Sequence, residues 1–388
     1  MEGCTEGFHM NIEQRRWTER DGWIPGTPTG FPDPPQLVFV FGNTALLGDR
    51  TCYRDIQSLY PAAYIIGCST AGEIHGTEVL DHSIIATAIY FTHTPVTVAH
   101  STIKKRGKSF KAGEDLARSI ETEGLRHALV LSDGLTINDS ELVKGLSKHL
   151  TKGVSITGGL SGDGDRFRET LVICDGLPKQ NRVVIAGFYG DNIDIEYGSQ
   201  GMWDPFGPER LVTRSRANIL YELDGKSALE LYKKYLGRHA DDLPATALLF
   251  PLSIRYEDNE TERVRTILSL DEHDRSMTFA GDVPEGAYAR FMKANVNHLI
   301  DGAVEAAEEC STSLGGKSPD LAILISCLGR RIVLKQRMEE EIEGVQGVLG
   351  DHTALTGFYS YGEIAPLAHG APCELHNQTM TITAFQER

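Results

Sequence analysis

The chain has 388 residues, 40% of them hydrophobic and 24% charged, which is an ordinary composition for a globular protein of two domains. Its formal net charge of −16 argues against nucleic acid as a partner, because phosphate binding needs a positive surface. Seven cysteines without a Cys-x-x-Cys pair, the lack of a signal-peptide pattern and the lack of a membrane-length apolar run predict a cytoplasmic protein with reduced thiols.

The first 35 residues are dense in proline and glycine and show no periodicity. This composition predicts a tail or strap outside the core, with Trp17 and Trp23 able to anchor it to the body.

From residue 36 a strand–helix–strand pattern begins. Residues 36–41 are a continuous apolar run typical of a buried strand, and residues 52–59 carry apolar side chains at helical spacing. A second apolar run ends at Gly67. The same order recurs twice more, in residues 127–132, 138–150 and 154–159, and then in residues 321–326, 338–349 and 353–357.

The segment between the second and third copies has a different pattern. Residues 227–237 predict a helix closed by glycine, residues 264–279 a hairpin, and residues 286–310 a long helix. We therefore expect an α/β fold with mixed sheets, in which two related domains, 36–225 and 226–388, surround a shared cleft.

The strand-end loops of the copies resemble one another. Residues 67–74 read GCSTAGEI and residues 357–364 read GFYSYGEI, and each octet opens with a glycine that a hydroxyl residue follows three positions later. Residues 158–161 repeat the glycine and the hydroxyl. His82 and His376 begin similar apolar runs, so they are predicted to be equivalent structural residues.

The chain resembles the FIST family, with FIST N and FIST C domains in tandem. The motifs that carry this resemblance are GCSTAGEI, ALVLSDG, GGLSGDG, SCLGRR, GFYSYGEIAP, LHNQTMT and a long connector that begins GSQGMWDPFGPERLV. The resemblance implies an intracellular sensor of a small molecule, with amino acids among the ligands suggested for the family.

Some members of this family are haem-binding sensors of nitric oxide that regulate a separate histidine kinase or cyclic-di-nucleotide enzyme. We recognise no kinase, cyclase or DNA-binding segment in the sequence, so an output through a partner chain is expected. A homodimer is an open alternative.

The loops supply the candidate ligand-binding residues. Glycine at a strand end lets the backbone approach a ligand, and exposed amides with a nearby hydroxyl suit a carboxylate. The alternative is that these glycines only make tight turns. The candidates are Gly67, Cys68, Ser69, Thr70, Glu73, Gly158, Gly159, Ser161, Arg330, Tyr359, Ser360, Glu363 and Asn377.

Arg330 and Arg331 follow the strand that ends near Cys327, and at least one is expected close to the loop at 357–363. An arginine binds a carboxylate bidentately, and a glutamate such as Glu363 receives an ammonium group. The alternative is a structural ion pair between Arg330 and Glu363.

Two further readings concern metal and catalysis. His369, Cys373 and His376 form H-x3-C-x2-H, and non-covalent haem b has axial candidates in His352, His376 and Cys327, the haem reading resting on the resemblance. A hydrolase would need Cys68 or Ser69 as its nucleophile. That reading is disfavoured because the G-x-S-x-G frame is missing.

Overall fold

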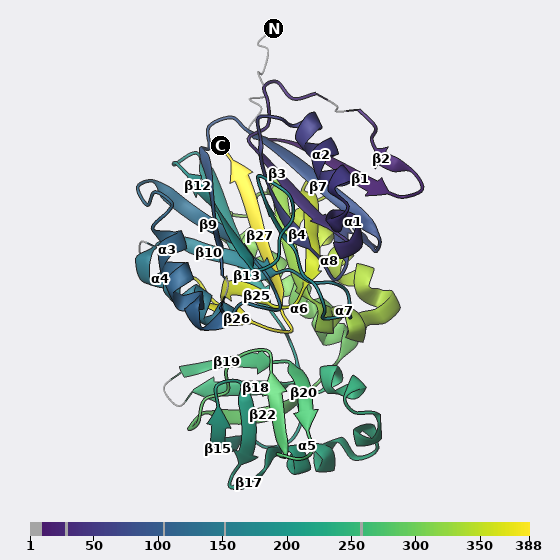
Figure 1. Ribbon diagram of the computed structural model, residues 1–388, viewed down its shortest axis with the longest axis vertical. Helices are drawn as coiled ribbons and strands as arrows, with labels where there is room; N and C mark the ends of the chain where they lie inside the picture. The colour runs from purple at the N-terminus through teal and green to yellow at the C-terminus, as the bar shows by residue number, and fades with distance from the viewer. Residues whose placement is uncertain (1–9, 28–29, 104, 151–152, 257–258) are drawn as a thin grey trace.

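The computed structural model describes residues 10–27, 30–103, 105–150, 153–256 and 259–388. The fold is mixed α/β, as predicted (Figure 1). Three six-stranded mixed sheets form the body, in the upper part of the view, and residues 204–293 form a separate antiparallel sheet below it.

Each sheet of the body is built around one parallel pair of strands, so the body contains three copies of one unit. In the first, β3 and β4 are parallel, and β7 and β1 extend the sheet on the β3 side. Its elements are β1 (Met10–Thr18), β2 (Gly22–Ile24), β3 (Leu37–Gly42), α1 (Thr44–Gly48), α2 (Arg50–Leu59), β4 (Tyr64–Ser69), β5 (Glu73–His75), β6 (Glu78–Leu80) and β7 (Ser83–Phe91).

The prediction of an N-terminal tail is wrong for residues 10–24. β1 pairs with β7 along its whole length, and β2 forms a hairpin with β1. The inward side chains of this strand are Glu13 and Arg15, which bond to each other in the core. The sequence therefore shows no apolar alternation there, and the strand could not be predicted from periodicity. Trp17 and Trp23 do pack against the body, as expected.

The second unit has the parallel pair β9 and β10, with β12 and β8 beyond β9. The predicted helix is confirmed as α4, and Asn138 caps it by accepting a hydrogen bond from the amide of Glu141. Its elements are β8 (Val96–Thr102), η1 (Arg106–Lys108), α3 (Ser109–Ala117), β9 (Leu125–Ser132), α4 (Asp139–His149), β10 (Ser155–Leu160), β11 (Val172–Cys174) and β12 (Arg182–Tyr189).

The third unit has the parallel pair β23 and β24, with β27 and β13 beyond β23. Its elements are β13 (Ile193–Gln200), α6 (Val296–Ser313), β23 (Leu321–Cys327), α7 (Leu328–Leu334), η4 (Lys335–Arg337), α8 (Met338–Leu349), β24 (Ala354–Ser360), β25 (Glu363–Pro366), β26 (Cys373–His376) and β27 (Met380–Glu387).

The three units exchange strands in a cycle. β5 leaves the first unit and pairs with β24 of the third, β25 leaves the third and pairs with β10 of the second, and β11 leaves the second and pairs with β4 of the first. The exchange interlocks the units, and their facing sheets bury a common apolar core that includes Phe41, Leu131, Ile325, Phe358 and Phe385.

Residues 204–293, which we call the insert, interrupt the third unit between β13 and α6. Its strands and helices are β14 (Asp204–Pro205), β15 (Arg210–Arg216), β16 (Ile219–Leu223), β17 (Lys226–Ser227), α5 (Ala228–Leu236), η2 (Gly237–Asp242), η3 (Ala245–Leu249), β18 (Leu252–Tyr256), β19 (Asn259–Arg265), β20 (Ile267–Asp271), β21 (Ser276–Phe279) and β22 (Tyr288–Lys293).

The predicted domain boundary near residue 225 lies within the insert, where Leu223 pairs with Lys226. One prediction for this region, the long helix, needs correction. The helix predicted over residues 286–310 begins only at Val296, and Met292 belongs to β22, from which it packs against Leu299 and Val333. The hairpin is confirmed by the pairing of β20 with β21. Among the described residues, no helix is long and apolar enough to cross a membrane.

Candidate functional site

The strand-end loops of the three units meet and bond to one another through their backbones. The amide of Ala71 donates to the carbonyl of Tyr359 at 2.8 Å, the amide of Leu160 donates to that of Gly362 at 2.9 Å, and the amide of Gly162 donates to that of Ser69 at 2.9 Å. Each loop therefore bonds to both of the others. We call this ring of loops the junction, and the two octets lie side by side in it.

The repeated glycines serve packing in the junction. A Cβ atom on Gly67 would lie 1.8 Å from the carbonyl oxygen of Val40, on the parallel neighbour strand. A Cβ atom on Gly158 would lie 1.9 Å, and one on Gly357 1.8 Å, from a carbonyl oxygen of its own parallel neighbour strand. These glycines allow two strands to approach closely, so the expectation that they approach a ligand is wrong.

Both octets hold a buried glutamate in the same way. Thr70 donates its hydroxyl to Oε1 of Glu73 at 2.5 Å, and Ser83 donates its amide and hydroxyl to Oε2. In the second octet Ser360 donates to Oε1 of Glu363 at 2.5 Å. Thr379 donates its amide and hydroxyl to Oε2 of that carboxyl group.

Burial shapes the electrostatics of these two carboxyl groups. It raises the pKa of Glu73 to about 7 and that of Glu363 to about 8, although the donated hydrogen bonds oppose the rise. The protonated carboxyl group is thus favoured in the folded protein well above its ordinary pH range.

The shared geometry also corrects a predicted equivalence. Ser83 and Thr379 each donate an amide and a hydroxyl to the glutamate of their octet, so they occupy equivalent positions. The residues before them, His82 and Gln378, are therefore equivalent, and both have a positive φ. His376 is therefore not the counterpart of His82. It is buried and donates Nε2 to the carbonyl of Ala365, which agrees with a structural histidine, whereas His82 is exposed.

Most of the predicted ligand residues are buried inside the junction. Tyr359 donates its hydroxyl to Glu341, and Ser161 donates to the carbonyl of Ser132. Asn377 is 1% exposed, and neither side-chain polar atom has a partner among the described residues. The other members of this buried group are Cys68, Ser69, Gly159, Ser360 and Glu363.

Burial also removes the hydrolase reading of Cys68 and Ser69. Cys68 is 0% exposed, and burial raises the pKa of its thiol well above the ordinary value. Ser69 accepts a hydrogen bond from the amide of Leu171. Neither group reaches a surface from which it could attack a substrate.

Arg330 is not a ligand residue, which corrects both readings of it. It is 0% exposed and bonds through Nε and Nη2 to Oε2 of Glu341, at 3.2 and 2.8 Å. It also donates to the carbonyls of Gly201 and Leu299. Its ion-pair partner is thus Glu341, and not Glu363.

Arg331 lies beside the junction, as expected of at least one of the two arginines. Its guanidinium group is 5.6 Å from the ring centre of Tyr359 and donates to the carbonyl of Ala71 at 2.5 Å. Its other Nη atom donates to Asp81 at 2.5 Å. Its side chain is 16% exposed, so it can meet a ligand.

A cavity of about 660 Å³ opens beside Arg331, and we call it the junction cleft. It lies at the carboxyl ends of the parallel strands, where ligands commonly bind in α/β folds. Loops of the first and second units and α7 of the third unit enclose it. Its polar lining residues are Asn43, Thr70, Glu73, Asp81, His82, Asp163, Asp165, Arg166, Arg331, Lys335 and Gln336.

The cleft carries charges of both signs. The side chains of Lys335 and Asp165 have no hydrogen-bond or ion-pair partner among the described residues, and both residues are exposed. Asp163 is fixed differently, because its carboxylate accepts the hydroxyl of Tyr361 and the amides of Phe167 and Arg168. The cleft can therefore offer a cation and an anion to one bipolar ligand.

Only Thr70 and Glu73 of the predicted ligand residues line the cleft. The reasoning from sequence missed Asp81, Asp165 and Lys335, and it favoured Arg330 over Arg331. Helical phase would have corrected the last choice, because Val333 and Leu334 share the buried face of α7 with Arg330.

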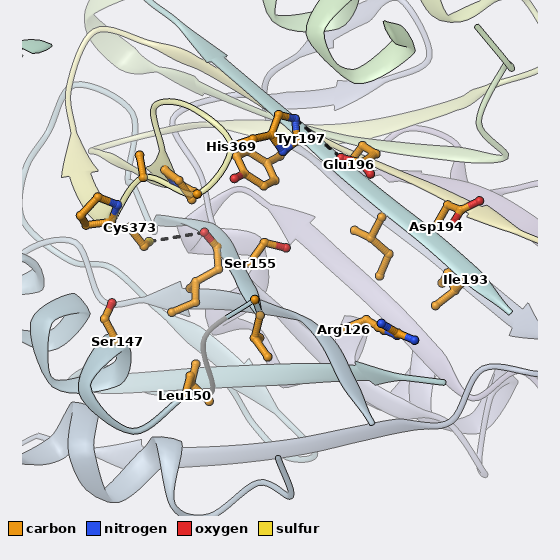
Figure 2. Close-up of a pocket in the computed structure, with 18 of the residues that line it drawn as sticks. Arg126, Ser147, Leu150, Ser155, Ile193, Asp194, Glu196, Tyr197, His369 and Cys373 are labelled. Carbon is orange, nitrogen blue, oxygen red and sulfur yellow. Dashed lines mark hydrogen bonds and ion pairs between the residues drawn. The ribbon is translucent and has the colours of Figure 1, made fainter. Parts of the chain in front are cut away.

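A second cavity, of about 940 Å³, lies at the amino ends of β9 and β10 (Figure 2). Its charged groups largely satisfy one another, since Arg126 pairs with Asp191 and Arg388 pairs with Asp194. His369 stands 3.7 Å from Glu196. Because these charges are already paired, the junction cleft is the stronger candidate.

The same view corrects the H-x3-C-x2-H reading. His369 lies against Tyr197, whereas Cys373 donates its thiol to the carbonyl of Ile156 on another wall (Figure 2). His376 is buried elsewhere. No group of three or more metal-ligating side chains gathers within the part of the chain that the structure describes.

The haem candidates do not converge. His352 is exposed just before β24 begins, and Cys327 is buried beside Ser360, where that strand ends. A strand of seven residues separates these two positions by about 20 Å. Burial lowers the pKa of His376 to about 4, and its ring is already bonded to Ala365. Haem binding stays a prediction, in which the three residues are alternatives for one axial ligand and not a common site.

Family models match the chain over most of its length. The FIST N domain matches residues 36–226, and the FIST C domain matches residues 228–366. An uncharacterised protein of Methanocaldococcus jannaschii is 21% identical over 332 residues, which are 79% of this chain and 62% of that protein. The chain thus spans less than two thirds of that relative.

Two solved structures align with nearly the whole chain. A cyanuric acid hydrolase from A. caulinodans has 8% identity and a TM-score of 0.37, with 97% of this chain and 99% of that chain covered. A second cyanuric acid hydrolase has 9% identity and a TM-score of 0.32, with 98% and 100% covered. Likenesses at this level carry no argument about fold or activity.

Proposed function

Because this chain belongs to the FIST family, whose domains are signalling sensor domains, we propose that it senses a small amino-acid-like ligand in the junction cleft. In this proposal it acts as a binding protein and signals through a separate partner protein. The family resemblance makes a histidine kinase the leading class of partner.

The observation that carries the proposal is the pair of unsatisfied, opposite charges in one cleft. The side chains of Lys335 and Asp165 have no partner in the part of the chain that the structure describes, and Arg331 holds Asp81, whose side chain is 58% exposed. A ligand carboxylate can replace Asp81 on the planar guanidinium group, which favours bidentate acceptors. A ligand ammonium group would then lie toward Asp165.

The position of the cleft supports a sensory role. Each of the three units contributes part of its wall, through Thr70, Asp165 and Arg331. A ligand that bridges the units stabilises the arrangement in which all three walls are in place. Such differential binding shifts the population of conformers, and a partner can read that shift on the surface.

The test is a thermal-shift screen of the full chain with free amino acids, followed by calorimetry on any hit. We expect binding to need both charged groups, so matched analogues that lack either the carboxylate or the ammonium group should not bind. Arg331→Gln should weaken the hit by about tenfold or more, as expected when one charge-assisted contact is lost.

Arg337→Gln is the matched control. Arg337 lies on the same segment but outside the cleft, where it pairs with the exposed Glu340. The Arg337→Gln variant should bind the hit as tightly as the unaltered protein does. The proposed function is overturned if no amino acid binds, or if Arg331→Gln binds the hit as tightly as Arg337→Gln does.

A further inference from the structure

A third cavity, of about 410 Å³, lies between the insert and the body. Three elements line it. Helix α4 contributes Lys144 and Lys148, the insert contributes Tyr256, Arg265 and Asp282, and the start of β26 contributes Cys373 to Leu375. Ser147 and Cys373 also belong to the larger cavity of Figure 2, so the two cavities share a wall.

Arg265 is the unusual residue of this cavity. It is 5% exposed, yet within the described residues its guanidinium group bonds only to the carbonyl oxygens of Val264, Asp282 and Leu375. Its Nη2 atom donates to no described residue. Burying a guanidinium group is costly unless an anion accompanies it, and burial lowers the pKa of this one.

Two of the buried arginines of the body are paired with acids, whereas Arg182 donates to the carbonyl oxygens of Val172 and Leu177 and to no described acid. Arg15 bonds to Glu13, and Arg330 bonds to Glu341. Arg263, the neighbour of Arg265 on β19, forms an ion pair with Glu374. The carboxylates of Glu374 and, more weakly, Asp282 favour the charged form of Arg265, but its hydrogen bonds within the described residues go to backbone carbonyls and to neither carboxylate.

The two lysines add donors to the same space. Lys144 and Lys148 are four residues apart on α4, so they share one face of the helix. Each ammonium group donates to one glutamate, Glu141 at 2.7 Å and Glu114 at 2.9 Å, and keeps further N–H groups for another acceptor.

We propose that this cavity binds a small oxyanion of the phosphate type, which bridges Arg265 of the insert to Lys144 and Lys148 of the body. A tetrahedral dianion suits the site because it can accept from one guanidinium and two ammonium groups at once. The bound anion would fasten the insert to the body beside the ion pair of Arg263 with Glu374. This proposal does not depend on a ligand in the junction cleft.

The experiment titrates the full chain with inorganic phosphate at constant ionic strength, by calorimetry and by the shift in unfolding temperature. Binding should saturate, and the double variant Lys144→Gln/Lys148→Gln should weaken it by about tenfold or more. Lys111→Gln, an exposed lysine paired with Asp115 on the neighbouring helix α3, is the control and should bind within about twofold of the unaltered protein.

Arg265→Gln should abolish phosphate binding, and the double lysine variant keeps the test valid if that buried substitution prevents folding. Arg331→Gln should leave phosphate binding unchanged, which separates this site from the junction cleft. Phosphate that fails to saturate, or that binds the double lysine variant as tightly as the control, overturns the proposal.

Discussion

The octets at residues 67–74 and 357–364 fold into the same structure at two places in the junction. Each begins with a glycine pressed against a parallel neighbour strand. Each continues with a hydroxyl residue that donates to a buried glutamate, and each then sends a strand into the sheet of another unit.

The two octets differ in what lies beside them. After the first, Asp81 is exposed and faces Arg331 across the junction cleft. After the second, the equivalent residue Asn377 is buried, and the next residue, Gln378, donates to Thr266 of the insert. The shared motif therefore builds the scaffold, whereas the neighbouring elements decide whether an open site forms there.

The largest effect expected from this comparison is the loss of the motif glycines. Gly67→Ala and Gly357→Ala should each destabilise the protein by about 3 kcal/mol or more, because the new Cβ atom would overlap a backbone carbonyl that cannot move freely. Chemical denaturation monitored by circular dichroism measures the free energy of unfolding.

Gly347→Ala is the control for that measurement. Gly347 lies on the exposed face of α8, with open space around it, so alanine should stabilise the helix by up to about 1 kcal/mol. If Gly67→Ala were tolerated and Gly357→Ala were not, the two octets would not be structurally equivalent.

The next largest effect is a difference in stability between variants of the two adjacent arginines beside the second octet. Arg330→Met should lower the free energy of unfolding by about 3–5 kcal/mol, because it leaves the carboxylate of Glu341 buried without its cation. Arg331→Gln should cost at most about 1 kcal/mol, because its partner Asp81 is exposed. Equal losses in the two variants, measured by urea denaturation, would contradict the division into a structural and a ligand-binding arginine.

The sequence predicted those parts of the fold that local periodicity encodes. The parallel pairs, the helices between them and the cap at Asn138 follow from apolar spacing and turn residues, and the structure contains them. It did not reveal β1, because Glu13 and Arg15 occupy its inward face. It also did not reveal the strand exchange, because β11 and β4 are joined by contacts about a hundred residues apart.

The candidate site was predicted less well, for a related physical reason. Glycine and hydroxyl residues at strand ends indicate a tight backbone, but they do not say whether a ligand or another strand fills the space beside it. At Gly67 another strand fills that space. The cleft residues Arg331, Lys335 and Asp165 come together only when three units close on one another.

The smallest expected effect distinguishes the two buried glutamates by pH. In the unfolded chain each glutamate loses its proton near its ordinary pKa, whereas the folded protein keeps it up to about pH 7 at Glu73 and about pH 8 at Glu363. The folded state therefore binds more protons over this interval, so stability falls as pH rises through it. The loss of stability should end at a pH about one unit higher for Glu363 than for Glu73.

Glutamine keeps the shape of the protonated side chain and cannot ionise, so Glu73→Gln and Glu363→Gln should each remove one part of this fall. Between pH 5 and pH 9, the gain relative to the unaltered protein should be larger for Glu363→Gln by about 1.4 kcal/mol, the equivalent of one pKa unit. Urea denaturation at a series of pH values measures both gains. Equal gains would mean that the carboxyl group of Glu363 is no more desolvated than that of Glu73, and that the two octets differ only outside the junction.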